Sequence, residues 1–277
     1  MPRLVESIRD NYTTMFQSHT KIGVITIKDG IFDSSPHMQQ LHSYFANDQI
    51  KAILLKIDSP GGAAGTGFAL YDEIKALKKE FPKPIITLVE NMCTSSAYLI
   101  ATATDHIITS SLATIANIEL YTSFTNFNKL LTHSNIEYNN ISAGAYKTIG
   151  DPLSPISEEQ KTSLQQLQND AYQQFIKIVA KERKLSLVDV SLWGNGKIFT
   201  GKQAIEIGLA DSIGSLHHAK QILKQKAFIE SDIRWVNSPA ESGFFSHITE
   251  SAKKQFSIFS SSLLQFILSS QEYLPLF

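Results

Sequence analysis

A pair of glycines stands between an apolar run and a helical pattern. The segment Asp58–Gly62 reads Asp-Ser-Pro-Gly-Gly; it closes the run Ala52–Ile57, and an amphipathic pattern covers Thr66–Leu77. A strand that ends in such a turn at a helix start leaves backbone N–H groups unpaired and directed at one spot, as an oxyanion or a phosphate requires. These residues alone still favour a plain tight turn without a ligand.

Ser95 is the second residue that could do chemistry. It follows the apolar run Pro84–Val89 through a polar turn and precedes Ala97–Ala103, whose small residues are typical of a helix packed closely on a sheet. A serine at this place usually caps the helix by accepting a backbone N–H. A nucleophilic serine there would gain from the helix dipole, which stabilises developing negative charge.

A serine nucleophile needs a base, and the histidines are poor candidates. His106 begins an expected strand, His133 lies in an expected helix, and His217 and His218 are remote in sequence. None has the flanking glycines or carboxylates that would single out a catalytic histidine. Neither H-x-x-E-H nor H-E-x-x-H occurs, and Cys93 is the single cysteine, so we expect no metal site and no internal disulfide.

A lysine is the alternative base. Burial can lower the pKa of a lysine from about 10.4 to about 7, where it can accept a proton. Lys147 is the candidate because its segment, Ser142–Pro152, is irregular and rich in small residues, so apolar surface could surround the amine. Without any comparison, a lysine in a loop is most often a solvated charge.

The elements that must position these residues alternate between strand and helix. Four apolar runs are separated by helical patterns: Ile22–Ile27, Ala52–Ile57, Pro84–Val89 and His106–Thr109. This order predicts an α/β fold with a mainly parallel sheet flanked by helices. A right-handed crossover places the second and third strands side by side, so the turn at Asp58–Gly62 should meet the turn at Ser95.

Composition narrows the function classes. The chain has 277 residues and a formal net charge of -1, which gives no electrostatic reason to expect nucleic acid. The N-terminal segment Met1–Lys21 lacks the apolar core of a secretory signal, so we expect a cytoplasmic protein. The apolar segment Ile258–Leu268 is far shorter than the ~20 residues of a membrane span, but it could lie on a membrane surface.

Four motifs together resemble a known family. Their order and spacing are similar to those of the signal peptide peptidase A (SppA/SohB-like) family of serine proteases, peptidase family S49. The resemblance extends from about Ile22 to about Leu223, and each motif is weak alone but the four in order are specific. The motifs are Asp58–Gly62, Ser95–Tyr98 before Asp105–Ile107, Gly144–Lys147 with Pro152, and Gly196–Ala204 followed by Gly208–Asp211 and Gly214.

The resemblance implies a crotonase-like or Clp-protease-like fold and a Ser-Lys dyad without a cofactor. Ser95 matches the family's nucleophile because it stands three residues before Tyr98, and Lys147 matches the general base. Gly61 and Gly62 match the oxyanion loop. The implied substrates are hydrophobic or signal-peptide-like peptides, and proteins with this fold commonly build ring-like oligomers.

The chain departs from the family pattern at two places. The family usually has Ser-Gly-Gly-Tyr at the nucleophile, whereas Ser96 and Ala97 stand here, which would strain the turn if either needs φ > 0. Ser96 as nucleophile would break the spacing to the motif tyrosine. The family's Gly-Ser-Ile-Gly-Val is replaced by the segment Ala116–Leu120, where Asn117 could orient the lysine and Glu119 could favour its charged form.

The sequence also suggests domain boundaries and two alternative functions. We expect an N-terminal extension over 1–21, a peptidase-like domain over 22–226 and a tail of unknown role over 227–277. Ser157 and Gln160 form a capping-box pattern that begins a long helix with an apolar face. The changes at the nucleophile turn leave open an inactive homologue that acts as a scaffold or adaptor, and an acyl-CoA enzyme of the crotonase type is a further alternative.

Overall fold

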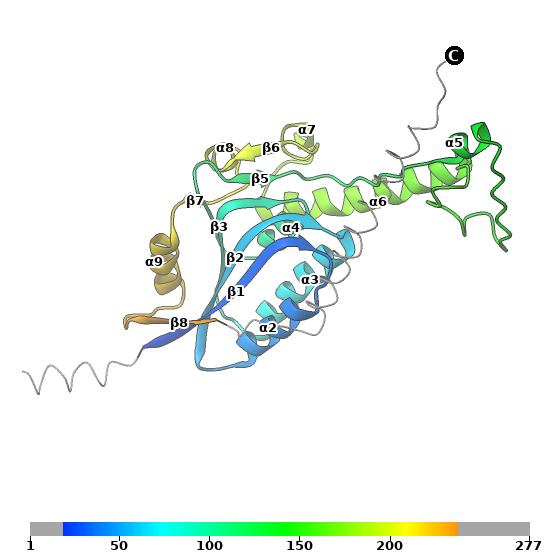
Figure 1. Ribbon diagram of the computed structural model, residues 1–277. Coiled ribbons are helices and arrows are strands. Elements are labelled where there is room, and N and C mark those ends of the chain that lie inside the picture. Colours follow the sequence, from blue (N-terminus) through cyan, green and yellow to red (C-terminus); the bar gives the residue numbers. More distant parts are fainter. Residues whose placement is uncertain (1–18, 238–277) are drawn as a thin grey trace, which may run out of the picture. The chain divides into compact units, whose positions relative to one another are not determined.

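An eight-stranded, mainly parallel sheet is the centre of the fold (Figure 1). This computed structural model describes residues 19–237. The strand order is β6-β5-β3-β2-β1-β8, while β4 pairs with both β3 and β7; the β5–β6 pair is antiparallel and the other pairs are parallel. The strands are β1 Thr20–Ile31, β2 Ile50–Gly62, β3 Ile85–Thr94, β4 Ile107–Thr109, β5 Thr114–Ala116, β6 Ile198–Thr200, β7 Ser212–Ile213 and β8 Ile233–Asn237.

Helices cover both faces of this sheet (Figure 1). Helices α2, α3, α4 and α6 pack on one face, where residues such as Leu55 and Leu70 share a core. Helix α9 packs on the other face, where Leu54 and Leu223 share a second core. Successive strand residues point to opposite faces, so strands buried on both sides read as continuous apolar runs. The helices are α2 Ser35–Ala46, α3 Ala64–Glu80, α4 Ser96–Thr102, α5 Asn128–His133, α6 Glu158–Arg183, α7 Val190–Trp193, α8 Gly201–Glu206 and α9 Leu216–Lys226.

The expected α/β layout is confirmed. All four predicted runs are strands, in β1 to β4, and β2 and β3 are parallel neighbours. Helix α3 ends at Glu80, just before Pro82 and Pro84, which cannot continue a helix. The carboxyl ends of β2 and β3 therefore lie at the same edge of the sheet.

Helix α6 begins at the predicted capping box. Ser157 Oγ accepts the Gln160 N–H at 3.1 Å, and Gln160 Oε1 accepts the Ser157 N–H at 3.1 Å. The C-terminal half of α6 enters the core through Phe175 and Val179. The predicted apolar face is not buried along its whole length, because Leu167, in the N-terminal half, is 61% exposed.

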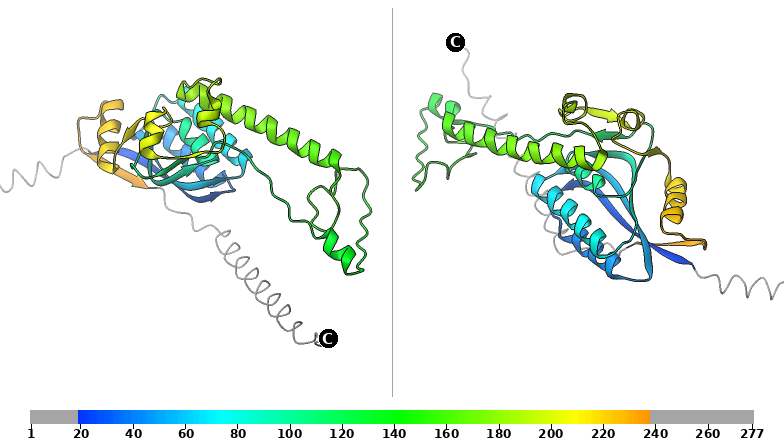
Figure 2. Two further views of the ribbon diagram at one scale, coloured as in Figure 1. Left: turned by 90° about the horizontal axis from the view of Figure 1, so that it is seen from above. Right: turned by 180° about the vertical axis from the view of Figure 1, so that it is seen from behind.

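Residues 119–157, called the arm here, run along the exposed half of α6. Gln168 donates to Thr122 near the middle of the helix, and Gln160 Nε2 donates to Ala145 O at its start, 2.5 Å away. Figure 2 shows from two further directions that α6 extends beyond the sheet and that α5, within the arm, lies near its far end. The arm is therefore held by α6 rather than by the sheet.

The sheet extends past the domain boundary expected at residue 226. Strand β8 pairs in parallel with β1, with Thr20 opposite Ile233 and Val24 opposite Asn237. Within residues 19–237, no helix combines the length and the apolar character of a membrane span. The segment Ile258–Leu268, expected to lie on a membrane or a partner, falls outside the described residues.

Candidate active site

Ser95 lies between β3 and α4 in an unusual backbone conformation. Its φ is 55° and its ψ is −128°, a region that side chains disfavour. The Ser95 N–H donates to Ala116 O at 2.7 Å and its C=O accepts the Leu99 N–H at 3.1 Å, so the backbone is held from both sides. The half-buried Ser95 side chain makes no capping bond to α4. The capping interpretation of this serine therefore fails, and strain held by the surrounding structure is a feature of functional sites.

Ser95→Gly is expected to raise the free energy of unfolding by about 1 kcal/mol, because glycine adopts this conformation without strain but is more flexible when unfolded. Ser95→Ala keeps Cβ and should stay within about 0.5 kcal/mol of the wild type. Urea denaturation of the three proteins measures the difference. Equal stability of the glycine and alanine variants would show that the Ser95 backbone carries no strain.

The Gly-Gly turn meets the Ser95 turn, as the sequence predicts. Gly61 has φ 96°, and a methyl group on it would lie 2.8 Å from Ser95 Cβ and 2.8 Å from Thr94 O. A methyl group on Gly62 would lie 2.2 Å from Ile31 O. Both positions therefore exclude a side chain, and the close approach of backbone to Ser95 depends on glycine.

The two glycines differ in what their N–H groups do. The Gly61 N–H donates to Ser59 Oγ at 3.1 Å. Ala63 N–H donates to Ile31 O on the β1 side at 2.9 Å, so the Gly62 N–H, one residue earlier, faces the β3 side. The β2–β3 pairing ends at Ser59 opposite Cys93, which leaves Gly62 beyond the ladder. Gly62 is thus the glycine whose donor faces the Ser95 turn.

The backbone N–H of Ser96 is a second group close to the Gly-Gly turn, whereas the sequence pointed only to the Ser96 side chain. Ser96 is the first residue of α4, and the first N–H groups of a helix have no intrahelical partner. Its backbone nitrogen would lie 3.0 Å from a methyl group on Gly61, so it is close to the Gly-Gly turn. The sequence signal was its position directly after a serine at a helix start.

Ser96 and Ala97 cause no backbone strain. Neither has a positive φ, and both belong to α4. The Ser96 side chain is buried and its Oγ has no hydrogen-bond partner among the described residues. A buried hydroxyl cannot reach a peptide, so Ser96 is not placed as the nucleophile.

Lys147 does not lie beside Ser95 within one chain. It is exposed on the arm, two residues after Ala145, which is bonded to Gln160 at the start of α6. Ser95 directly precedes α4, and Phe175 of α6 packs in the same core as that helix. The 15 residues from Gln160 to Phe175 span about 22 Å of helix. The expected burial of this lysine is therefore absent in a single chain.

Asn117 and Glu119 have different surroundings. Asn117 directly follows Ala116, whose C=O accepts the Ser95 N–H, so Asn117 adjoins the serine. Ala116 and Asn117 both have positive φ, 83° and 49°. The Glu119 carboxylate lies toward Gly196, where a methyl group would be 2.0 Å from Oε2. Burial first and the Glu119 charge second raise the pKa of Tyr172, a residue of α6.

The closing motif anchors α4. Tyr98, fully buried in α4, donates to Leu209 O at 2.8 Å. Arg183 of α6 donates to Gly208 O at 2.9 Å and to both oxygens of Asp211 at 3.0 and 2.8 Å. Burial would raise the pKa of Asp211, but the hydrogen bonds and charge of Arg183 hold it below its usual range.

The remaining features of the site are structural. His106 Nε2 lies 2.8 Å from Ser212 Oγ, between neighbouring strands, in agreement with its expected structural role. In residues 19–237 no cluster of His, Cys, Asp and Glu side chains is placed to hold a metal ion.

Comparison with known proteins identifies the family. The model of peptidase family S49 matches residues 77–230, more than half of the chain. The chain belongs to peptidase family S49. The Clp protease model also matches this S49 chain, over residues 6–117, which agrees with the parallel sheet and its flanking helices. S49 is a serine protease family, so the resemblance seen in the motifs and the expected Clp-protease-like fold are confirmed.

Relatives of this S49 chain include proteins of an archaeon, a bacterium and a plant. "Putative protease MJ0651" of Methanocaldococcus jannaschii is 31% identical over 73% of this chain and 66% of its own length. "Putative signal peptide peptidase SppA" of Enterococcus faecium is 30% identical over 68% of this chain and 55% of its own. "Serine protease SPPA, chloroplastic" of Arabidopsis thaliana is 30% identical over 69% of this chain and 28% of its own length. The S49 chain thus spans about two thirds of the first of these relatives and less of the others.

Proposed function

We propose that the chain is a serine endopeptidase that cleaves hydrophobic or signal-peptide-like peptides with a Ser-Lys dyad. The observation that carries the proposal is the strained, uncapped Ser95, held against a Gly-Gly turn that has no room for a side chain. Membership of family S49 supports serine chemistry at this position. Lys147 is the proposed general base, from its place in the third motif.

The proposed mechanism is acyl transfer. A neutral Lys147 takes the proton of Ser95 Oγ as this oxygen bonds to the scissile carbonyl carbon, and the carbonyl oxygen becomes the oxyanion. The N–H groups of Gly62 and Ser96 are the proposed oxyanion donors. Lys147 then passes its proton to the leaving amine as the C–N bond breaks. Water releases the acyl group from Ser95 by the same steps.

The separation of Ser95 and Lys147 within one chain supports the proposal of a homo-oligomer. We infer that the arm of one copy brings Lys147 to Ser95 of the neighbouring copy. The arm is rich in large apolar side chains that are 43% to 101% exposed, and association would remove them from water. These side chains are Tyr121, Phe124, Phe127, Leu130, Ile136, Tyr138, Ile141 and Tyr146. Asn117 is the proposed residue that orients the incoming lysine, and its position next to Ser95 supports this role.

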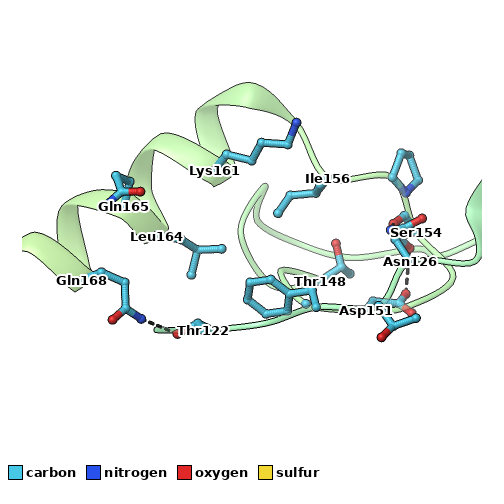
Figure 3. Close-up of a pocket in the computed structure, with 14 residues that line it drawn as sticks. Thr122, Asn126, Thr148, Asp151, Ser154, Ile156, Lys161, Leu164, Gln165 and Gln168 are labelled. Carbon is cyan, nitrogen blue, oxygen red and sulfur yellow. Dashed lines mark hydrogen bonds between the residues drawn. The ribbon is translucent and has the colours of Figure 1, made fainter. Parts of the chain in front are cut away.

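A pocket next to Lys147 supports an apolar substrate. It has a volume of about 300 Å³ and lies between the arm and α6 (Figure 3). Leu164 and Ile156 point into it in Figure 3, and Thr148, the neighbour of Lys147 in sequence, also lines it. If the arm carries Lys147 to a scissile bond, this pocket comes close to the substrate side chains beside that bond. Apolar substrate side chains are the expected occupants of the pocket.

The test is hydrolysis of a hydrophobic peptide pool by the wild type, Ser95→Ala and Lys147→Ala, with products identified by mass spectrometry. Each variant is expected to lose at least about 10³-fold in kcat, because nucleophile and base act as a unit. Ser111→Ala and Lys129→Ala, at exposed positions, are the matched controls. Folded variants that cut like the wild type would refute the dyad. No cleavage by any protein would favour the inactive scaffold, which the exposed Lys147 of a single chain also fits.

A further inference from the structure

Two neighbouring strands are irregular at the same level of the sheet. The β1–β2 register shifts between Lys28 and Gly30, and the β2–β3 register shifts between Ile57 and Ser59. Asp29, at the first irregularity, has φ 60°. Such bulges re-aim the chain and are frequent beside active sites. Here they lie just before the Gly-Gly turn.

Ser59 joins these two irregularities. Its side chain is fully buried. Ser59 Oγ donates to Asp29 O at 2.5 Å and accepts the Gly61 N–H at 3.1 Å. One hydroxyl therefore serves as donor to the β1 bulge and as acceptor from the oxyanion turn. An apolar residue at position 59 would leave a backbone C=O and a backbone N–H without this partner, which is costly in a buried site.

We propose that Ser59 is a positioning residue that sets the direction of the oxyanion turn. The proposal rests on the proposed function. The bond to Ser59 holds the Gly61 N–H on the buried side, and the peptide unit that follows then carries the Gly62 N–H to the side of Ser95. Ser59 acts through Gly61 and does not touch the substrate.

The close packing around Gly61 makes the site sensitive to the direction of the Gly-Gly turn. A methyl group on Gly61 would lie 2.8 Å from Ser95 Cβ and 3.0 Å from the Ser96 nitrogen, so the turn is in contact with both the nucleophile and a donor. A shift of the turn would change the distance from the Gly62 N–H to the oxyanion. Displacements of about 1 Å at a catalytic group can cost about 10²-fold in rate.

The test compares Ser59→Ala with Thr87→Val in the full-length protein. Thr87 is also fully buried, and its hydroxyl bonds to Thr104 Oγ1 at 3.0 Å, in the part of β3 that pairs with β4 rather than at the catalytic edge. Ser59→Ala is expected to lower kcat about 10- to 100-fold with KM within about twofold, and to speed hydrogen exchange at the Gly61 amide. Thr87→Val is expected to lose stability while keeping kcat.

Three outcomes would overturn the inference: a folded Ser59→Ala protein with wild-type kcat, an equal fall of kcat in Thr87→Val at matched stability, or unchanged exchange at Gly61. If the wild-type protein cleaves no peptide, the proposed function fails. The exchange comparison still decides in that case whether Ser59 holds the turn, so the two failures are distinguishable.

Discussion

Mixed oligomers of Ser95→Ala and Lys147→Ala chains are expected to recover about a quarter of wild-type hydrolysis, although each variant alone is inactive. A composite site is active when its serine comes from the Lys147→Ala chain and its lysine from the Ser95→Ala chain, which holds for about one site in four after random assembly. The reason is the position of Lys147 on the arm, whose contact at Gln160 is about 22 Å of helix from Phe175, the α6 residue that shares a core with α4.

Co-expression of the two variants at equal levels gives the randomly assembled oligomers for this measurement, and a different tag on each variant shows that both chains are present. The control replaces the Ser95→Ala chain with one carrying both substitutions, which supplies no lysine and should restore nothing. Mixed oligomers that stay inactive would mean that the arm turns back onto its own chain, or that Lys147 is not the base.

Gly67→Ala is expected to lower the free energy of unfolding by about 2 to 4 kcal/mol, because α3 and α4 are in close contact there. A methyl group on Gly67 would lie 2.5 Å from Ser96 Cβ. Both residues are buried, so neither helix can shift without moving the turn at Ser95. Chemical denaturation of the purified proteins measures the loss.

Gly65→Ala is the matched control, since a methyl group at Gly65 in the same helix meets nothing within 4 Å. This control should be neutral or stabilising, as alanine favours helix over glycine by about 1 kcal/mol. Ser96→Gly should rescue Gly67→Ala, because the next contact of the added methyl group is Ser96 Cα at 3.2 Å. Similar stability of Gly67→Ala and Gly65→Ala, or a lack of rescue, would show that the Ser96 side chain does not exclude a methyl group at Gly67.

The rescue also bears on how this chain differs from its family. The family usually has glycine where Ser96 stands, and Ser96 brings a buried hydroxyl that finds no hydrogen-bond partner within residues 19–237. The cost of that change lies in packing against Gly67 and not in the backbone, since the φ of Ser96 is not positive. Strain is instead at Ser95, Ala116 and Asn117.

The main strands, the turn at Ser95 and the start of α6 could be predicted because their signals are local. Apolar runs bounded by Gly and Pro mark β2 and β3, and the capping box at Ser157 and Gln160 marks the start of α6 within one turn of chain. The neighbouring position of the two turns followed from the handedness of a parallel crossover. Motif order then pointed to the family.

The sequence by itself determined the alternation of strands and helices, the neighbouring position of β2 and β3, and the meeting of Gly61 and Gly62 with Ser95, since each depends on short-range patterns. The Ser-Lys dyad stays a prediction from motif order. Only the tertiary structure decided where Lys147 lies, because α6 holds the arm beyond the sheet. The number of residues between two positions does not give their distance in the folded protein. The tertiary structure also decided that Ser59 bonds the Gly61 N–H, since that contact depends on a bulge in another strand. Long-range packing sets such contacts, and no local pattern encodes them.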